Sequence, residues 1–466
     1  MALIKSISGI RGTIGNSVGS DLTPIDLVKF TAAYGTHLLQ SSSDTTVNKT
    51  VVLGRDARIS GEMVSNIVVG TLQSVGLNVI DIGLATTPTV EMAVTAENAI
   101  GGIVLSASHN PKEWNALKLL NEKGEFLSKS AGEQVLEIAD AGSFTFVEVD
   151  EIGAHSQKDT YLDYHIEQIL QYDLVDVEAI KARSFKVVVD GVNSVGGFAI
   201  PALLKALGVE TVFELYCEPT GRFPHNPEPL PQHLSAISNE VKRQNADLGI
   251  VVDPDVDRLA LVCEDGEMFG EEYTLVAVAD YVLQHRKGNT VSNLSSTKAL
   301  KEVTEKAGGT YYAAAVGEVN VVEQMKANNA VIGGEGNGGV IVPDLHYGRD
   351  ALIGVALFLS HLAKFGESCS MLRASYPNYH ISKNKIKLTP DIDVDDILVK
   401  IAKKYKNYPQ MTIDGLKLTF DGGDWVHLRK SNTEPIIRIY SESSLKTTAD
   451  AMANRIMQDI REMSKG

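Results

Sequence analysis

The sequence predicts an α/β protein with three related α/β domains, each built on a mixed, mostly parallel sheet, followed by a C-terminal antiparallel α+β domain. Two observations indicate this fold class. The order strand, polar turn, helix, glycine, strand, which is typical of a β-α-β unit, occurs three times along the chain. The region after residue 375 lacks that order and shows neighbouring strands flanked by amphipathic helices. A chain of 466 residues is long enough for several such domains.

Each of the three repeats begins with an apolar run that leads into a polar turn, and its helix ends before a glycine. A glycine at that point permits the left-handed backbone that commonly ends a helix. The predicted elements are a strand at 51–56, a helix at about 60–75 and a strand at 78–82; then a strand at 185–190, a helix to 207 and a strand at 211–215; then a strand at 290–294, a helix to 307 and a strand at 311–315.

The last region predicts a different arrangement. Three short apolar segments read as adjacent strands and two amphipathic segments read as helices. The strands are predicted at 416–420, 425–429 and 436–441, and the helices at 392–405 and 445–463. We therefore expect four domains, at 1–150, 151–253, 254–374 and 375–466.

Composition excludes several classes of partner. The formal net charge is −16 and the isoelectric point is about 5.2, so nucleic acids and anionic membranes are poor partners. The three cysteines, Cys217, Cys263 and Cys369, are scattered without metal-binding spacing and suit a reducing compartment. No signal-peptide core and no membrane-spanning apolar run is present in the sequence. These features predict a soluble cytoplasmic protein, and they leave a monomer and a homodimer both open.

The most informative segment is the loop Ser106 to Pro111, which follows the apolar run Ile100 to Leu105. We expect a helix from Lys112 to Leu120 after it. A serine between a buried strand and a helix N-terminus is well placed for phosphate chemistry, because that end of a helix favours negative charge. The alternative is an ordinary turn rich in serine, asparagine and proline.

A second segment carries three aspartates, Asp253, Asp255 and Asp257, directly after the apolar run Leu248 to Val252. Alternate residues of an extended chain point the same way, so the three carboxylates converge and favour a hard cation such as Mg²⁺. An EF-hand loop is disfavoured because its sixth position is Arg258 rather than glycine. A solvated acidic turn is the remaining alternative.

The third segment, Gly333 to Gly339, has five glycines in seven residues, so its backbone can approach a ligand closely. Its Glu335 and Asn337 suit sugar hydroxyls, whereas the alternative is a flexible linker. It lacks the Gly-Lys-Ser/Thr ending of a P-loop.

The fourth segment, Arg429 to Pro435, is followed by Arg438. Its arginines and hydroxyls would form a phosphate clamp, and the alternative is a surface hairpin with exposed cations.

Together these segments resemble the α-D-phosphohexomutases, which include phosphoglucomutase/phosphomannomutase and phosphoglucosamine mutase. Members of that family carry a catalytic serine loop, a three-aspartate metal loop, a Gly-Glu sugar loop and a C-terminal phosphate loop, in this order. The resemblance extends from the segment Ile7 to Gly12 as far as Arg438. It implies four domains around a central cleft, with one loop from each domain.

The resemblance also implies a mechanism. Ser108 would carry a phosphate, and Asp253, Asp255 and Asp257 would hold one Mg²⁺ per chain against an oxygen of that phosphoserine, so that Ser108 counts among the metal ligands. The phosphoryl group would pass to a phosphorylated hexose and give a 1,6-bisphosphate. This intermediate would turn round and return its other phosphate to Ser108. Added hexose 1,6-bisphosphate would therefore activate the enzyme.

Further roles follow from matching positions. Arg11, Lys118 and His109 would join Ser108 in catalysis, through proton transfer, transition-state charge or placement of the phosphate. Without the resemblance, Lys118 would be read as a solvated cation on a helix. The expected substrate-binding residues are Arg258, Gly317, Glu318, Glu335, Asn337, Arg429, Ser431, Asn432, Thr433 and Arg438.

Two departures from the family pattern bear on the sugar. Asn337-Gly338-Gly339 replaces Ser-Gly-His, and Glu318 follows Gly317 where many relatives have histidine. A carboxylate suits an ammonium group, which favours phosphoglucosamine mutase, and the alternative interpretation of Glu318 is a surface carboxylate. The alternative is phosphomannomutase/phosphoglucomutase activity on mannose or glucose phosphates. A metal-dependent sugar phosphatase and a non-catalytic phosphosugar sensor are hypotheses of other classes.

Overall fold

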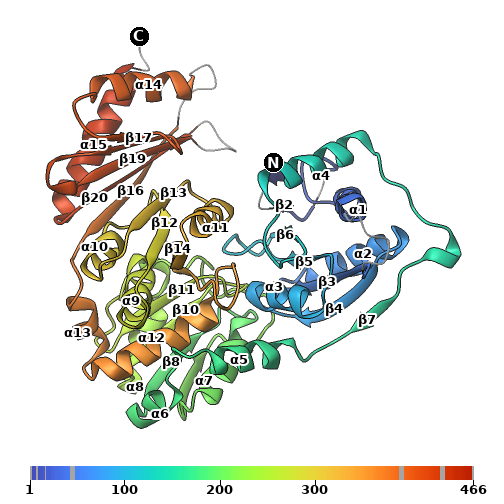
Figure 1. Ribbon diagram of the computed structural model, residues 1–466, viewed down its shortest axis with the longest axis horizontal. Helices are drawn as coiled ribbons and strands as arrows, with labels where there is room; N and C mark the ends of the chain where they lie inside the picture. Colours follow the sequence, from blue (N-terminus) through green and yellow to red (C-terminus); the bar gives the residue numbers. More distant parts are fainter. Residues whose placement is uncertain are drawn as a thin grey trace.

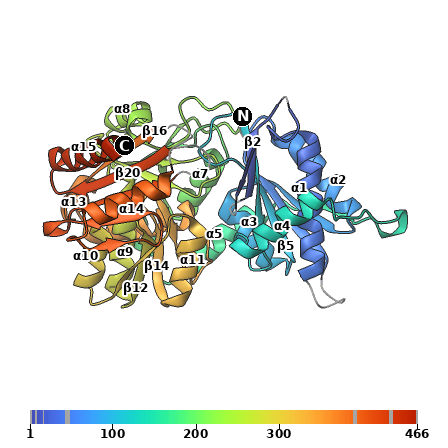
Figure 2. The same ribbon diagram turned by 90° about the horizontal axis from the view of Figure 1, so that it is seen from above.

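The computed structural model describes residues 3–6, 9–15, 17–41, 48–387, 393–430 and 436–463. Four sheets divide the chain into four domains that follow one another along the sequence (Figure 1). Seen from above, the first domain lies on one side and the other three lie together on the other (Figure 2). The predicted fold class, three α/β domains followed by an antiparallel α+β domain, is confirmed.

The first domain contains a seven-stranded mixed sheet in the order β1-β2-β6-β5-β3-β4-β7. Its strands are β1 (Leu3–Ser6), β2 (Gly9–Thr13), β3 (Thr50–Arg55), β4 (Asn78–Leu84), β5 (Gly101–Leu105), β6 (Trp114–Leu120) and β7 (His155–Gln157), and its helices are α1 (Pro24–Ser41), α2 (Gly61–Ser74), α3 (Thr87–Ala96) and α4 (Lys129–Ala141).

The second domain has a four-stranded sheet in the order β11-β10-β8-β9. Its elements are α5 (Tyr161–Gln171), α6 (Val177–Arg183), β8 (Lys186–Asp190), α7 (Gly196–Ala206), β9 (Thr211–Leu215), α8 (Ser235–Gln244), β10 (Leu248–Val252) and β11 (Leu259–Cys263). The third domain has the order β13-β12-β14-β15. Its elements are α9 (Glu271–His285), β12 (Asn289–Asn293), α10 (Ala299–Lys306), β13 (Tyr311–Ala314), α11 (Glu318–Ala327), β14 (Ala330–Glu335), β15 (Gly339–Ile341), α12 (Ala351–Phe365) and α13 (Cys369–Ala374).

The fourth domain is an antiparallel five-stranded sheet in the order β16-β20-β19-β18-β17. Its elements are β16 (His380–Lys387), α14 (Val394–Lys404), β17 (Gln410–Met411), β18 (Leu416–Thr419), β19 (Trp425–Lys430), β20 (Ile436–Ser443) and α15 (Lys446–Met463). Both α-helices contribute apolar residues, such as Ile401 and Ile456, to one core with the sheet.

The predicted repeat is visible in the sheets. Each of the first three domains contains the same four-strand core, in the orders β4-β3-β5-β6, β9-β8-β10-β11 and β13-β12-β14-β15. In every copy the first three strands are parallel and the fourth is antiparallel. The serine, aspartate and glycine-rich loops each join the third strand to the fourth. Three different chemistries therefore occupy one topological position.

The helix predicted from Lys112 to Leu120 is wrong. Residues Trp114–Leu120 form β6, which pairs antiparallel with β5 and β2. Helices cover both faces of the first sheet. Val51 of β3 packs into the core on one face, and the next residue, Val52, packs into the core on the other. A strand buried on both faces is apolar at successive positions and does not alternate, so its pattern resembles that of a buried helix. The serine loop therefore lies between two strands and not at a helix N-terminus.

Two predicted domain boundaries fall inside sheets. The boundary after Asp253 lies in the loop between β10 and β11, which pair with each other, so the second sheet continues to Cys263. The boundary after residue 150 precedes β7, which pairs with β4 of the first sheet. Both differences arise because strand pairing, which the sequence does not show directly, decides to which sheet a segment belongs.

The second and third domains share one apolar core. It joins β-strand residues such as Val189 and Ile250 to helix residues such as Val276 and Ile353. None of the helices in the described ranges is long and apolar enough to cross a membrane.

One lysine at the contact between the third and fourth domains gives a pH-dependent prediction. Burial lowers the pKa of Lys417 to about 8, and its Nζ donates to the carbonyl of Leu294 at 2.7 Å. The unfolded chain has a lysine pKa of about 10.4, so between about pH 8 and 10.4 it binds more protons than the folded chain. Stability contributed by this residue should therefore rise with pH in that window. Thermal unfolding of the Lys417→Met variant should lack this rise, and an unchanged pH profile would contradict the assignment.

Candidate active site

The three equivalent loops of the first three domains lie against one another. Ser108 of the first loop donates from Oγ to Asp253 Oδ2 of the second at 2.7 Å. Leu259, just after the second loop, donates its backbone N–H to the carbonyl of Gly338 in the third at 3.0 Å. Thr87 Oγ1, at the start of α3, donates to Asp255 Oδ2 at 2.5 Å. Segments far apart in sequence therefore form one site.

Ser108 is held in an unusual backbone conformation. Its φ is +48°, in the left-handed region that a non-glycine residue seldom adopts. Its backbone N–H donates to Ser106 Oγ at 2.9 Å, and Ser106 in turn donates to Asp56. The side chain is buried at 6 % exposure, and His109 Nδ1 lies 3.4 Å from its Oγ. Strain of this kind persists where surrounding contacts impose it, and functional sites are its commonest location.

Arg58, which the sequence analysis did not single out, imposes the shape of the serine loop. Its guanidinium donates to four backbone carbonyls of the loop, at 2.5–3.0 Å, and pairs with Asp56 at 3.0 Å. The acceptors are the carbonyls of Ser108, Asn110, Pro111 and Trp114. The residue is 1 % exposed. In the sequence it is an ordinary cation after a strand, and no local pattern reveals that it is buried.

The three aspartates fit a divalent cation. Asp253, Asp255 and Asp257 are completely buried, and one oxygen from each lies within 4.8 Å of the other two. Burial, Asp257 and Asp255 raise the pKa of Asp253 well above its usual range. Among the described residues, Oδ1 of Asp255 and Oδ1 of Asp257 have no hydrogen-bond donor. An oxygen-only set with unpaired buried atoms suits a hard divalent cation.

Lys118 lies beside these carboxylates, because β6 runs antiparallel to β5. Its Nζ contacts Asp255 Oδ2 at 2.5 Å and Asp257 Oδ2 at 3.5 Å. Burial disfavours the ammonium, but Asp255 and Asp257 outweigh burial and raise the pKa of Lys118. Lys118 is therefore charged. It is a buried ion-pair partner on a strand, and not the solvated helix cation of the alternative interpretation.

Three more predicted residues interact electrostatically with the aspartates. Burial and the nearby Arg258 lower the pKa of Arg11, which also interacts with Asp255 and Asp257. Burial, Arg258 and Arg11 lower the pKa of His109 well below its usual value, so its imidazole is neutral at neutral pH. The Arg258 side chain lies 3.9 Å from Asp257 and 3.8 Å from Glu228.

Arg349, in the segment before α12, joins the aspartate loop to the sugar loop. Its guanidinium contacts Asp257 at 2.7 Å, Glu335 at 2.8 Å and Glu318 at 2.9 Å. Burial would lower the pKa of Arg349, yet these carboxylates raise it well above its usual value. A Cβ on Gly339 would lie 2.3 Å from Arg349 Cδ, so the glycine at this position makes room for the arginine. No local sequence pattern around Arg349 indicates these carboxylate partners.

The predicted sugar-binding residues form part of this network. Glu318 is 8 % exposed, and both its oxygens accept from Arg349, through the backbone N–H and Nε. It is therefore neither a surface carboxylate nor an unengaged acceptor. Glu335 accepts from the backbone N–H of Gly317 at 3.1 Å. Asn337 lies 3.5 Å from Glu335 through its Nδ2.

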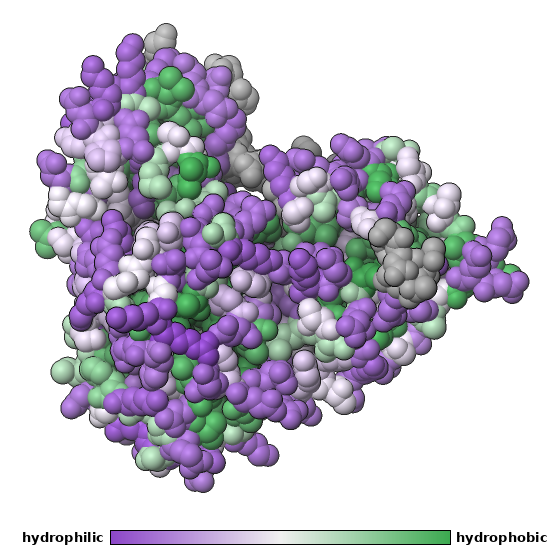
Figure 3. Space-filling model, in the orientation of Figure 1, coloured by the Kyte–Doolittle hydropathy of each residue, from purple (hydrophilic) through white to green (hydrophobic). Residues whose placement is uncertain are grey.

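Of the predicted phosphate-binding residues of the fourth domain, Arg429 and Arg438 are among the described residues. Ser431, Asn432 and Thr433 fall outside the described residues. Arg429 and Arg438 are directly opposed on β19 and β20, and like charges in that position are destabilising without an anion. Arg429 pairs with Asp414, which also accepts the backbone N–H of Val316 beside the sugar loop. The space-filling view shows a hollow between the fourth domain and the first (Figure 3).

Family models match all four domains. They are described as phosphoglucomutase/phosphomannomutase α/β/α domains I, II and III, over residues 3–146, 161–266 and 270–379, and the C-terminal domain, over residues 385–459.

The chain belongs to the phosphoglucomutase/phosphomannomutase family.

Individual family members resemble the chain over nearly its full length. A phosphoglucomutase/phosphomannomutase of Thermococcus kodakarensis is 37% identical, covering 98% of each chain. A probable phosphoglucosamine mutase of Methanopyrus kandleri is 31% identical, covering 97% of each. A crystal structure of a family protein from Burkholderia thailandensis superposes with a TM-score of 0.84 at 26% identity, covering 100% of this chain and 98% of that one. The predicted phosphohexomutase family is confirmed.

Substitution of Arg58 tests how the serine loop of this phosphohexomutase is held. Arg58→Met removes four donors to the loop and leaves Asp56 buried without its cation. We expect a stability loss of about 3–5 kcal/mol, and a turnover loss of roughly 100-fold in whatever protein still folds. Arg243→Met, which changes an exposed arginine in the second domain, is the matched control. Turnover equal to that of the control would contradict a positioning role.

Proposed function

We propose that this phosphohexomutase interconverts hexose 6-phosphates and hexose 1-phosphates through phosphorylated Ser108 and a hexose 1,6-bisphosphate. The observation that carries the proposal is the 2.7 Å contact between Ser108 Oγ and Asp253 inside a buried set of three aspartates. A serine side chain held at that position in a strained backbone suits transfer of a group to and from its oxygen.

The residues around Ser108 have two roles in phosphoryl transfer, proton transfer and stabilisation of charge. The sugar's free hydroxyl attacks the phosphorus of phosphoserine, the bond to Ser108 Oγ breaks, and the hydroxyl proton must leave. The released Ser108 Oγ takes up a proton, and in the return step the Ser108 hydroxyl attacks the sugar phosphate and gives that proton up. His109 is neutral and 3.4 Å from Oγ, so it can accept the Ser108 proton. Lys118 and Arg11 are cations, and they stabilise the charge that spreads over the phosphoryl oxygens.

Asp253, Asp255 and Asp257 would hold the metal ion, and Mg²⁺ bound there would neutralise phosphoryl charge beside Ser108. The unpaired oxygens of Asp255 and Asp257 support this assignment. Glu335 and Asn337 would receive the sugar hydroxyls, with Gly317, Glu318 and Arg258 shaping the same pocket. Arg429 and Arg438, with Ser431, Asn432 and Thr433, would hold the phosphate that is not reacting. A phosphate grip of this kind would allow the bisphosphate to be retained in either orientation, consistent with activation by added bisphosphate.

Burial of the serine favours a mutase over a phosphatase. Ser108 is only 6 % exposed, and exclusion of water protects a phosphoenzyme from hydrolysis. The phosphoryl group of phosphoserine is then transferred to a sugar in preference to water.

The identity of the hexose is a separate question. Glu318, the residue that favoured an amino sugar in the sequence, has both oxygens engaged by Arg349. A substrate ammonium would have to compete with that guanidinium. We therefore propose that mannose and glucose phosphates are converted at least as fast as glucosamine phosphate. Initial rates on the glucosamine, mannose, glucose and N-acetylglucosamine 1-phosphates, each primed with its bisphosphate, decide this. A clear preference for glucosamine phosphate that Glu318→Gln abolishes would restore the first interpretation.

Replacement of the serine tests the mechanism. Ser108→Ala should lose turnover by roughly 1,000-fold or more and should carry no phosphoserine in a mass spectrum, because the acceptor oxygen is gone. Ser128→Ala, at the N-cap of α4, is the matched control and should retain activity.

Full turnover in the Ser108→Ala variant would overturn the mutase mechanism. Stoichiometric release of inorganic phosphate by the unmodified chain would instead support the phosphatase hypothesis.

A further inference from the structure

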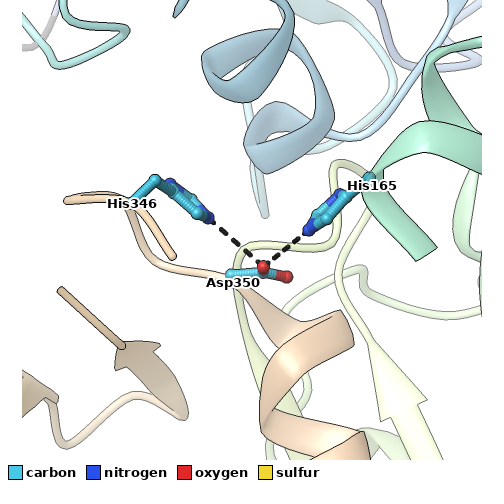
Figure 4. Close-up of side chains that lie close together, drawn as sticks. All are labelled: His165, His346 and Asp350. Atoms are coloured by element: carbon cyan, nitrogen blue, oxygen red, sulfur yellow. Dashed lines mark hydrogen bonds and ion pairs between the residues drawn. The ribbon is translucent and has the colours of Figure 1, made fainter. Parts of the chain in front are cut away.

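A second cluster of metal-ligating side chains lies behind the active site, where the first three domains meet. His165 comes from α5, His346 from the segment between β15 and α12, and Asp350 caps α12. Figure 4 shows both imidazole rings pointing at one oxygen of Asp350. None of these residues belongs to the phosphoryl-transfer site.

The donor atoms of this cluster converge. Asp350 Oδ2 lies 2.9 Å from His165 Nε2 and 3.2 Å from His346 Nε2. All three donor atoms lie within 4.8 Å of one another. Donor atoms bound to one tetrahedral zinc ion lie about 3.3 Å apart. The two Asp350–histidine distances are already close to that spacing.

The outer nitrogen of each histidine also has a partner. His165 Nδ1 lies 3.0 Å from Thr89 Oγ1, and His346 Nδ1 lies 3.3 Å from Glu91 Oε2. Thr89 and Glu91 both come from α3. Metal-binding histidines usually have the other ring nitrogen held by an oxygen in this way, which fixes the nitrogen that faces the metal.

Glu91 places a second buried carboxylate beside the cluster. It is 2 % exposed, and among the described residues its carboxylate receives no hydrogen bond, although its Oε2 lies 3.3 Å from His346 Nδ1. Gly348 permits its approach, since a Cβ there would lie 1.8 Å from Glu91 Oε2. Two buried carboxylates, Glu91 and Asp350, thus face two imidazoles. Despite burial, these carboxylates raise the pKa of His346, so without a metal a protonated His346 balances part of their charge, and a divalent cation would take the place of that proton.

We propose that His165, His346 and Asp350 bind a zinc ion or a similar late first-row divalent cation, with water completing the coordination. Two imidazoles and one carboxylate suit such ions, whereas the oxygen-only aspartate loop suits Mg²⁺. The two sites would therefore take different metals.

Bound metal at this site would fix residues of the active site. Arg349, which contacts Asp257, immediately precedes Asp350 in the chain. Thr87, which contacts Asp255, lies on α3 with Thr89 and Glu91. The cation would hold α3, α5 and the start of α12 together, and through them the two sides of the aspartate loop. The inference does not depend on which hexose is converted.

Zinc stoichiometry tests the proposal. The full chain is stripped with chelator, supplied with excess Mg²⁺ to fill the aspartate loop, incubated with Zn²⁺, desalted and analysed by elemental mass spectrometry. We expect one zinc per chain, and a rise in the thermal unfolding temperature on zinc addition. His165→Gln and His346→Gln should each lose the zinc, while His155→Gln, which changes an exposed histidine on β7, should retain it. Absence of zinc from the unmodified chain, or equal zinc in all variants, would overturn the proposal.

If the variants fail to fold, X-ray absorption spectroscopy of the zinc-loaded, unmodified chain can still identify the zinc ligands. Zinc bound at this cluster should show two imidazole ligands in its first shell. Zinc with oxygen ligands alone would place the ion in the aspartate loop and would contradict the proposal. In that case the cluster is a hydrogen-bonded network in which His346 carries the positive charge.

Discussion

The site depends on how a group of buried carboxylates is kept together. Asp257, Glu318 and Glu335 come from two different domains, and without a shared cation they would repel one another in an environment that screens charge poorly. Arg349 contacts all three at 2.7–2.9 Å. Removing one member of a buried ion-pair network is far more destabilising than losing an exposed pair, so the aspartate loop and the sugar loop are constrained to one relative position.

The same network reaches the neighbouring domains. Lys118 connects the first domain to Asp255 and Asp257, and Asp414 connects Arg429 of the fourth domain to the backbone beside Gly317. A displacement of one loop would therefore change the charged contacts that hold the others. This arrangement suits the mechanism we propose, in which a doubly phosphorylated intermediate is held while its two ends exchange places.

The sequence was most informative where chemistry requires particular residue types at short spacing. Ser108 and the three aspartates could be found because each follows an apolar strand, and the repeated strand order was visible from glycine positions. The fold class followed from the same pattern. The failures have a common physical cause: contacts between distant segments. Leu117 and its neighbours in β6 were read as helix because both faces of their strand are buried. Arg58 and Arg349 look like surface cations until the fold surrounds them with carbonyls and carboxylates. Glu318 could be singled out, but its partner could not.

The central claim is that the Ser108 oxygen lends a phosphoryl group to a sugar and recovers one within a single site. A rapid-quench, single-turnover experiment tests it most directly, with the enzyme carrying radiolabelled phosphate on Ser108 and an excess of unlabelled hexose 1-phosphate. The account predicts that label leaves the protein and appears first in hexose 1,6-bisphosphate and then in hexose 6-phosphate. Label that stays on the protein during product formation, or that leaves as inorganic phosphate, would contradict it.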